Sequence, residues 1–119
     1  MVHQHIINAC EYNSAIINIY LKNDDCEYLI KNYTNASITF CKVNLINDHI
    51  DCIKRMINVK YIKFVECKIK DNINLSKLNQ RLCFYEMDLS DKEIEIISQG
   101  NAKSLGFCNM DVPAYFGKC

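Results

Sequence analysis

Cysteine and histidine are the residues of this chain with the most specific chemistry. Eight cysteines stand at positions 10, 26, 41, 52, 67, 83, 108 and 119, and no two have the C-x-x-C spacing of common zinc sites. His3 and His5 form a His-x-His pair near Cys10, but no further ligand cluster follows them. A metal site needs a complete ligand set, so we expect neither a metal nor another cofactor.

Other catalytic and nucleotide-binding signatures are missing from the sequence. It contains none of the motifs G-x-x-x-x-G-K-[ST], G-x-G-x-x-G, G-x-S-x-G and H-E-x-x-H. Lys plus Arg and Asp plus Glu are balanced at 14 each, so no net charge attracts nucleic acid. One basic cluster is interrupted by Glu66 and comprises Lys60, Tyr61, Lys63, Lys68 and Lys70. We therefore predict a non-enzymatic protein without a nucleic-acid partner.

The sequence also indicates a compartment and a size class. Its first residues do not have the pattern of a secretory leader, so we do not expect one, and no apolar run approaches the ~20 residues of a membrane helix. We therefore expect an intracellular protein with free thiols and no membrane partner, and we attribute the sequons at Asn32, Asn35 and Asn74 to chance. With 119 residues, 50% of them hydrophobic and 24% charged, the chain is expected to form one folded domain over residues 1–119.

The elements that position these residues follow from an internal repeat. Residues 38–45 (ITFCKVNL), 62–69 (IKFVECKI), 82–89 (LCFYEMDL) and 105–112 (LGFCNMDV) share the pattern aliphatic-x-Phe-x-x-apolar-x-aliphatic. Residues 14–21 (SAIINIYL) fit it more weakly. The segments start at 14, 38, 62, 82 and 105, hence 24, 24, 20 and 23 residues apart. A period of this length is typical of stacked units that share one core.

The segments between these strands predict short helices. Helix-capping residues follow four of the strands: Asn23-Asp24, Asn47-Asp48, Asp71-Asn72 and Ser90-Asp91. Apolar residues spaced by three then favour helices over 24–33, 48–56 and 91–99. In the shorter third linker, Ile73, Leu75 and Leu78 indicate a turn or a 3₁₀ segment. We expect His49, in a helix start, to be solvated.

This arrangement resembles the leucine-rich-repeat family, whose core pattern is L-x-x-L-x-L-x-x-N/C-x-L. The second, third and last aliphatic positions are matched by Ile38, Phe40 and Leu45; by Ile62, Phe64 and Ile69; by Leu82, Phe84 and Leu89; and by Leu105, Phe107 and Val112. At the Asn/Cys position only Cys67 conforms, since the other units hold Ile19, Val43, Met87 and Met110. The Ile, Asn and Lys bias also resembles short leucine-rich-repeat families of large insect viruses such as entomopoxviruses.

The resemblance implies an α/β fold, a solenoid of about five strand–turn–helix units with a parallel concave sheet. Residues 14–112 would form the repeats, and residues 113–119 a short C-terminal cap. Residues 1–13 would form an N-terminal cap that covers the first repeat with Ile6, Ile7 and Tyr12. A globular α/β domain with accidental alternation remains an alternative. Ankyrin repeats are excluded because their ~33-residue units with paired helices are missing.

In this family the residues between the strand aliphatics lie on the concave face. The central row would be apolar, comprising Ile17, Cys41, Val65, Tyr85 and Cys108. Aromatic residues and Arg around an apolar strip are typical of binding hot spots. We therefore predict that a protein partner binds Tyr61, Lys63, Val65, Arg81, Tyr85 and Glu86. The alternatives are a row covered by the chain's own termini, a self-assembling structural unit, and a thiol-dependent enzyme using Cys83 or Cys108.

The C-terminal edge suggests an association state. We expect the fifth strand to end near Val112, followed only by PAYFGKC. Tyr115 and Phe116 would fold over the strand as a minimal cap. Otherwise the exposed edge would pair with a second copy, giving a homodimer through residues 105–116.

Overall fold

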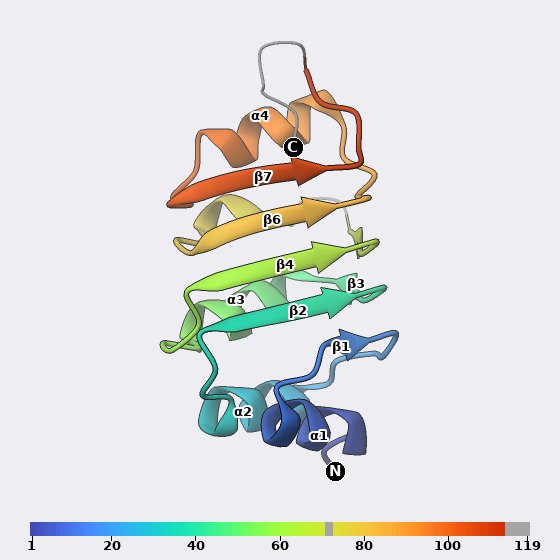
Figure 1. Ribbon diagram of the computed structural model, residues 1–119, viewed down its shortest axis with the longest axis vertical. Helices are drawn as coiled ribbons and strands as arrows, with labels where there is room; N and C mark the ends of the chain where they lie inside the picture. Colours follow the sequence, from blue (N-terminus) through green and yellow to red (C-terminus); the bar gives the residue numbers. More distant parts are fainter. Residues whose placement is uncertain (71–72, 114–119) are drawn as a thin grey trace.

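The computed structural model describes residues 1–70 and 73–113, which form an α/β fold built on a parallel sheet. Five strands lie side by side in chain order: β1 (Ile16–Ile17), β2 (Ser37–Cys41), β4 (Tyr61–Val65), β6 (Arg81–Tyr85) and β7 (Ser104–Cys108). A second, two-stranded sheet joins β3 (Asn44–Leu45) to β5 (Lys68–Ile69). The helices are α1 (Gln4–Tyr12), α2 (Asn23–Asn32), α3 (Asn47–Arg55), the 3₁₀ turn η1 (Leu75–Lys77) and α4 (Asp91–Ser98). In Figure 1, α3 and α4 lie behind the large sheet.

Strand register brings equivalent pattern positions together. Phe40 pairs with Phe64, Phe64 with Phe84, and Phe84 with Phe107. The successive ring centroids are 5.9, 5.4 and 5.5 Å apart, and the rings are within 16° of parallel. Phe40, Phe64 and Phe84 are at most 1% exposed. The predicted core positions are therefore confirmed for these four residues, and β1 places Ile16 opposite Phe40.

A left-handed residue follows each strand of the large sheet. Asn18, Lys42, Glu66, Glu86 and Asn109 have φ between 50° and 55°. The backbone N–H of each of the first four donates to the last residue of the next strand, at 2.8–3.0 Å. This turn separates β2 from β3 and β4 from β5. It also ends β7 at Cys108, so the expectation that the fifth strand extends to Val112 is wrong.

The helices fall where the sequence predicts them, within one residue at each end. Ser90 is an N-cap as expected, accepting from the Glu93 N–H at 3.1 Å. The caps predicted for α2 and α3 are wrong, because Asn23-Asp24 and Asn47-Asp48 lie in the first turn and the N-cap residues are Lys22 and Ile46. The third helical residue, Asp25 or His49, accepts from the N-cap N–H instead. The predicted cap Asp71-Asn72 lies outside the described residues.

His49 is buried rather than solvated, with only 2% of its surface exposed. Its Nδ1 accepts from the Ile46 N–H at 3.2 Å, which leaves Nε2–H to donate to the Leu21 carbonyl at 2.9 Å. The ring therefore joins the start of α3 to the chain that leads into α2. Leu21 is 28 residues away in sequence, so this contact has no local signal.

The N-terminal helix α1 packs against α2 and β1. Ile6 and Ala9 are fully buried and Ile7 is half-buried, but Tyr12 is 69% exposed and contributes no cover, contrary to expectation. Tyr12 is the last residue of the helix, and the following Asn13 turns away with a left-handed backbone. The ring Nε2 of His5 lies 3.1 Å from the Ala15 carbonyl and 3.2 Å from the Ile17 nitrogen, at the outer edge of β1.

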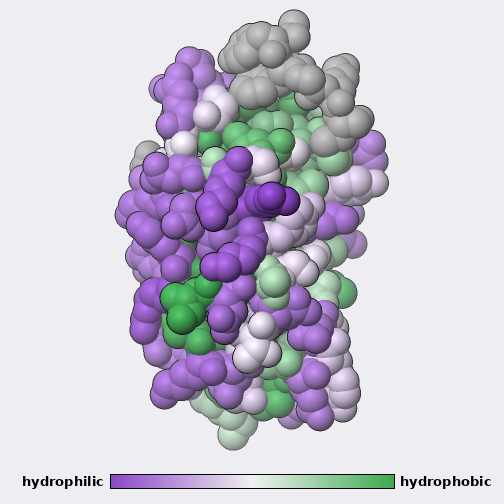
Figure 2. All heavy atoms as spheres, turned by 60° about the vertical axis from the view of Figure 1, so that its left-hand side comes forward, coloured by the Kyte–Doolittle hydropathy of each residue, from purple (hydrophilic) through white to green (hydrophobic). Residues whose placement is uncertain are grey.

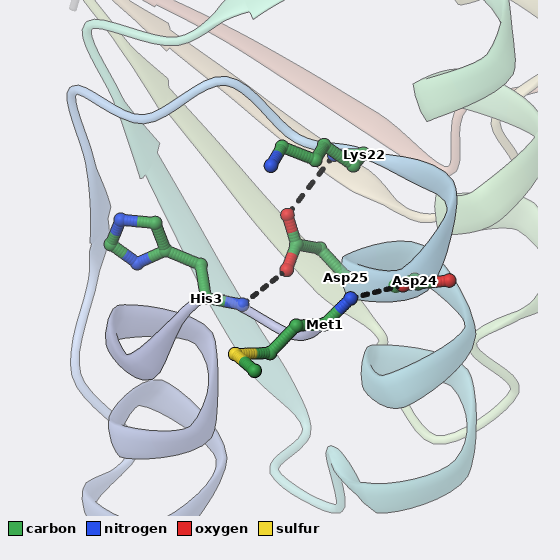
Figure 3. A network of polar contacts seen from close by, with 5 residues as sticks. All are labelled: Met1, His3, Lys22, Asp24 and Asp25. Atoms are coloured by element: carbon green, nitrogen blue, oxygen red, sulfur yellow. Dashed lines mark hydrogen bonds and ion pairs between the residues drawn. The ribbon is translucent and has the colours of Figure 1, made fainter.

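Asp25 ties α1 to α2, as Figure 3 shows. Its carboxylate is completely buried and accepts from the His3 N–H at 2.8 Å and from the Lys22 N–H at 3.0 Å. The neighbouring Asp24 is exposed and forms an ion pair with the Met1 ammonium at 2.7 Å. Asp25 thus caps the start of α2 and holds the start of α1, whereas Asp24 holds the N-terminus.

The C-terminal cap is described only at its first residue, the buried Pro113. Tyr115 and Phe116, the predicted aromatic cap, lie outside the described residues. Within the described part, no helix has the length and apolar character needed to cross a bilayer.

Candidate functional site

Side chains of the large sheet alternate between two faces. The Ile and Phe positions point to the helices and are buried, whereas the residues between them are only half-buried. We call the second set the outer face, which comprises Thr39, Cys41, Lys63, Val65, Cys83, Tyr85, Gly106 and Cys108. Three of the six predicted contact residues, Lys63, Val65 and Tyr85, belong to it.

Tyr85 lies at the centre of these contacts. The Lys63 Nζ lies 5.3 Å from the centroid of its ring, within cation–π distance. Val65 pairs with Tyr85 in the strand register, so an aliphatic side chain stands beside the ring. The Asn109 amide donates to the Tyr85 hydroxyl at 2.7 Å. Asn109 is not recognisable as a contact residue from the sequence, because this bond depends on strand register.

Tyr61 and Arg81 face one another at the beginning of β4 and β6. Tyr61 is 40% exposed, and Arg81 is also exposed. Glu86 differs from the other candidates because it lies just past the end of β6, in the left-handed turn. Its N–H bonds the Cys108 carbonyl at 3.0 Å, while its side chain is exposed. The structure thus spreads the six candidates along β4, β6 and the turn after β6.

The outer face also brings two thiols together. The Sγ atoms of Cys83 and Cys108 lie 4.0 Å apart, diagonally across β6 and β7. Neither has a histidine beside it in sequence: His3 and His5 are on or beside α1, and His49 is in α3. None of the three histidines lies on a strand of the large sheet, so the structure does not support activation of either thiol by a neighbouring imidazole.

The thiols differ in burial, and this gives a testable prediction. Cys26 and Cys67 are 8% and 4% exposed, whereas Cys83 is half-buried on the outer face. Burial also raises the pKa of the Cys67 thiol, so less thiolate is present at a given pH. We expect iodoacetamide to modify Cys83 about tenfold faster than Cys67 in the folded protein, as measured by mass spectrometry of digests.

Unfolded protein is the control, because burial no longer separates the two thiols. There we expect the two alkylation rates to converge. If Cys83 instead reacts much faster in the folded protein than in the unfolded chain, the face activates it, and the thiol-enzyme alternative gains support.

The four lysines of the basic cluster are not aligned on one surface. Lys60 precedes β4, Lys63 lies on the outer face, and Lys68 and Lys70 lie in or beside β5, beyond the turn. The ring nitrogens of His3 and His5 contact backbone groups near α1 and β1. In residues 1–70 and 73–113, no three His, Cys, Asp or Glu side chains gather as a metal-ligand set.

Comparison of the chain with protein-family models, with curated proteins and with solved structures finds no match.

Proposed function

We propose that the chain is a leucine-rich-repeat solenoid that binds a protein partner through the outer face of its sheet. The solenoid assignment is supported by the equivalent register of the Phe positions and by the left-handed turn that recurs after each strand of the large sheet. Five strands following one another in chain order are what stacked strand–turn–helix units produce.

The binding proposal rests on one observation, the aromatic and aliphatic strip around Tyr85. Val65 and the ring of Tyr85 lie side by side, and Lys63 and Asn109 contact Tyr85 from two sides. A ring held in this way loses little conformational freedom when a partner covers it. Exposed Tyr61 and Arg81 extend the same surface with two residue types that dominate interface hot spots.

The N-terminal segment does not compete for this surface. Helix α1 packs against α2 and β1, at one end of the sheet, and its polar contacts are with the same two elements. A partner therefore has access to the centre of β4 and β6 as far as the described N-terminal residues are concerned. The proposed function involves no catalytic step. It also places the protein in a reducing compartment, where its thiols remain free.

Affinity capture from the source cell tests the binding proposal. Tyr85→Ala removes the ring at the centre of the strip, so we expect it to weaken partner binding by about 2 kcal/mol, or roughly thirtyfold. Ile96→Ala is the matched control, because Ile96 is a 49% exposed apolar residue of α4, behind the sheet. Equal loss in both variants, or no loss in either, would contradict binding through the outer face.

A self-assembling unit is the second candidate, favoured by the position of β7 as the last strand of the sheet. The homodimer through residues 105–116 stays a prediction, since residues 114–116 lie outside the described part.

A further inference from the structure

A groove of about 540 Å³ lies where the strands begin, at the edge of the outer face. Its walls come from the residues at and just before the starts of β2, β4, β6 and β7 and from Lys54 near the end of α3. Figure 2 turns the side of the molecule with the strand starts forward and shows a mainly hydrophilic surface with small hydrophobic areas. The groove has no signal in the sequence, because it combines four segments that are far apart along the chain.

The charged lining of the groove has one sign. The lining contains no Asp or Glu. It contains four cationic side chains, which are Lys54, Lys60, Arg81 and Lys103. The ion pairs found in the described residues, Met1–Asp24 and Arg55–Glu27, involve none of them. Glu66 and Glu86 lie past the opposite end of β4 and β6. The groove is thus a local cationic surface on a chain without net charge.

Two further residues of the lining indicate what kind of ligand the groove would bind. Gln80, also in the lining, is only 6% exposed, and its Oε1 has no hydrogen-bond donor in the described residues. A buried carbonyl oxygen without a hydrogen-bond donor costs free energy. A ligand would therefore be favoured if it supplied an N–H to the Gln80 Oε1, which a rotation of the Gln80 side chain would turn toward the groove. Ile57, in the same lining, is 80% exposed and offers an apolar contact.

We propose that this groove binds an acidic peptide segment of the protein partner. Carboxylates of the segment pair with Arg81 and the three lysines, and Arg81 accepts the bidentate geometry that a carboxylate provides. A peptide also supplies backbone N–H groups for Gln80 and aliphatic side chains for Ile57. A phosphate-rich ligand fits less well, because unprotonated phosphate supplies no donor for Gln80 and no apolar contact for Ile57.

This inference deepens the proposed function and rests on it. Tyr61 and Arg81 belong both to the groove lining and to the predicted contact residues, so one partner would cover both surfaces. The Tyr85 strip would supply the apolar part of the interface. The groove would supply the charged part and therefore the selectivity for an acidic sequence.

Fluorescence anisotropy with a labelled glutamate-rich peptide tests this proposal on the full chain. We expect the glutamate peptide to bind more tightly than a glutamine-rich peptide of equal length and to dissociate as salt is added. The double variant Arg81→Gln, Lys103→Gln should raise its Kd by about three- to tenfold, as for the loss of two exposed ion pairs. Lys92→Gln, which removes an exposed lysine of α4, should leave the Kd unchanged.

Several outcomes would overturn the acidic-peptide assignment. These are equal binding of the glutamine peptide, an unchanged Kd for the double variant, and tighter binding of inorganic phosphate or of a single-stranded oligonucleotide of equal charge. The failure of this proposal is distinguishable from that of the proposed function. If Tyr85→Ala still weakens partner capture while the glutamate peptide does not bind, only the groove assignment is wrong.

Discussion

Replacing Phe64 by alanine is expected to lower the free energy of unfolding by about 3–5 kcal/mol, as for other large-to-small core changes. Phe64 is fully buried, and its ring stacks between Phe40 and Phe84, with centroids 5.9 and 5.4 Å away. The variant therefore loses the transfer free energy of the ring and its contacts with two neighbouring strands. Denaturant unfolding followed by circular dichroism measures the change.

Val65→Ala is the matched control for Phe64→Ala. Val65 is the next residue of the same strand, but it points to the outer face and is only half-buried. We expect a loss below about 1 kcal/mol for it, because its methyl groups already contact solvent. A loss below about 1 kcal/mol in Phe64→Ala as well would mean that the Phe positions are not in the core.

The second large effect is expected for Asp25. Asp25→Ala removes a fully buried carboxylate and leaves the part-buried N–H groups of His3 and Lys22 without their acceptor, so we expect a loss of about 2–4 kcal/mol. Asp25→Asn keeps one carbonyl acceptor and should recover part of this stability. The measurement is again denaturant unfolding, with the helical signal at 222 nm reporting on α1 and α2.

Asp24→Ala serves as the comparison, because Asp24 precedes Asp25 but is exposed and its carboxylate forms an ion pair with the Met1 ammonium. A much smaller change is expected, since water screens an exposed ion pair. Equal losses in the Asp24 and Asp25 variants would contradict the role of Asp25 as the link between α1 and α2.

The parallel sheet and its core could be predicted from local sequence because their signals are periodic. The Phe positions recur every 20–24 residues, and the register then brings Phe40, Phe64, Phe84 and Phe107 into one stack. The helix after each strand has a similar local signal, in capping residues and apolar spacing. The strand and helix patterns are each visible within a short segment, and their repetition along the chain indicates which segments are equivalent.

The remaining features depend on contacts between distant parts of the chain. The left-handed turns at Lys42, Glu66 and Glu86 have no glycine, the residue that usually marks this conformation. They are stabilised by hydrogen bonds to the next strand, which local sequence does not show. The contact between Cys83 and Cys108 likewise requires the register of two strands.

The candidate site was predictable only in part for the same reason. Alternation along β4 and β6 places Lys63, Val65 and Tyr85 on one face, as predicted. Glu86 is displaced from them, because the left-handed turn ends the alternation after Tyr85. The groove at the strand starts combines residues from several loops, and their spacing in sequence gives no indication of their proximity.

Chemical footprinting of the chain with its captured partner tests the central claim most directly. Acylation of Lys63 and alkylation of Cys83 report on the outer face, and acylation of Lys92 reports on α4, behind the sheet. Binding through the outer face predicts that the partner protects Lys63 and Cys83 severalfold and leaves Lys92 unchanged. Protection of Lys92 with full reactivity at Lys63 and Cys83 would contradict it, because the partner would then occupy the helical side.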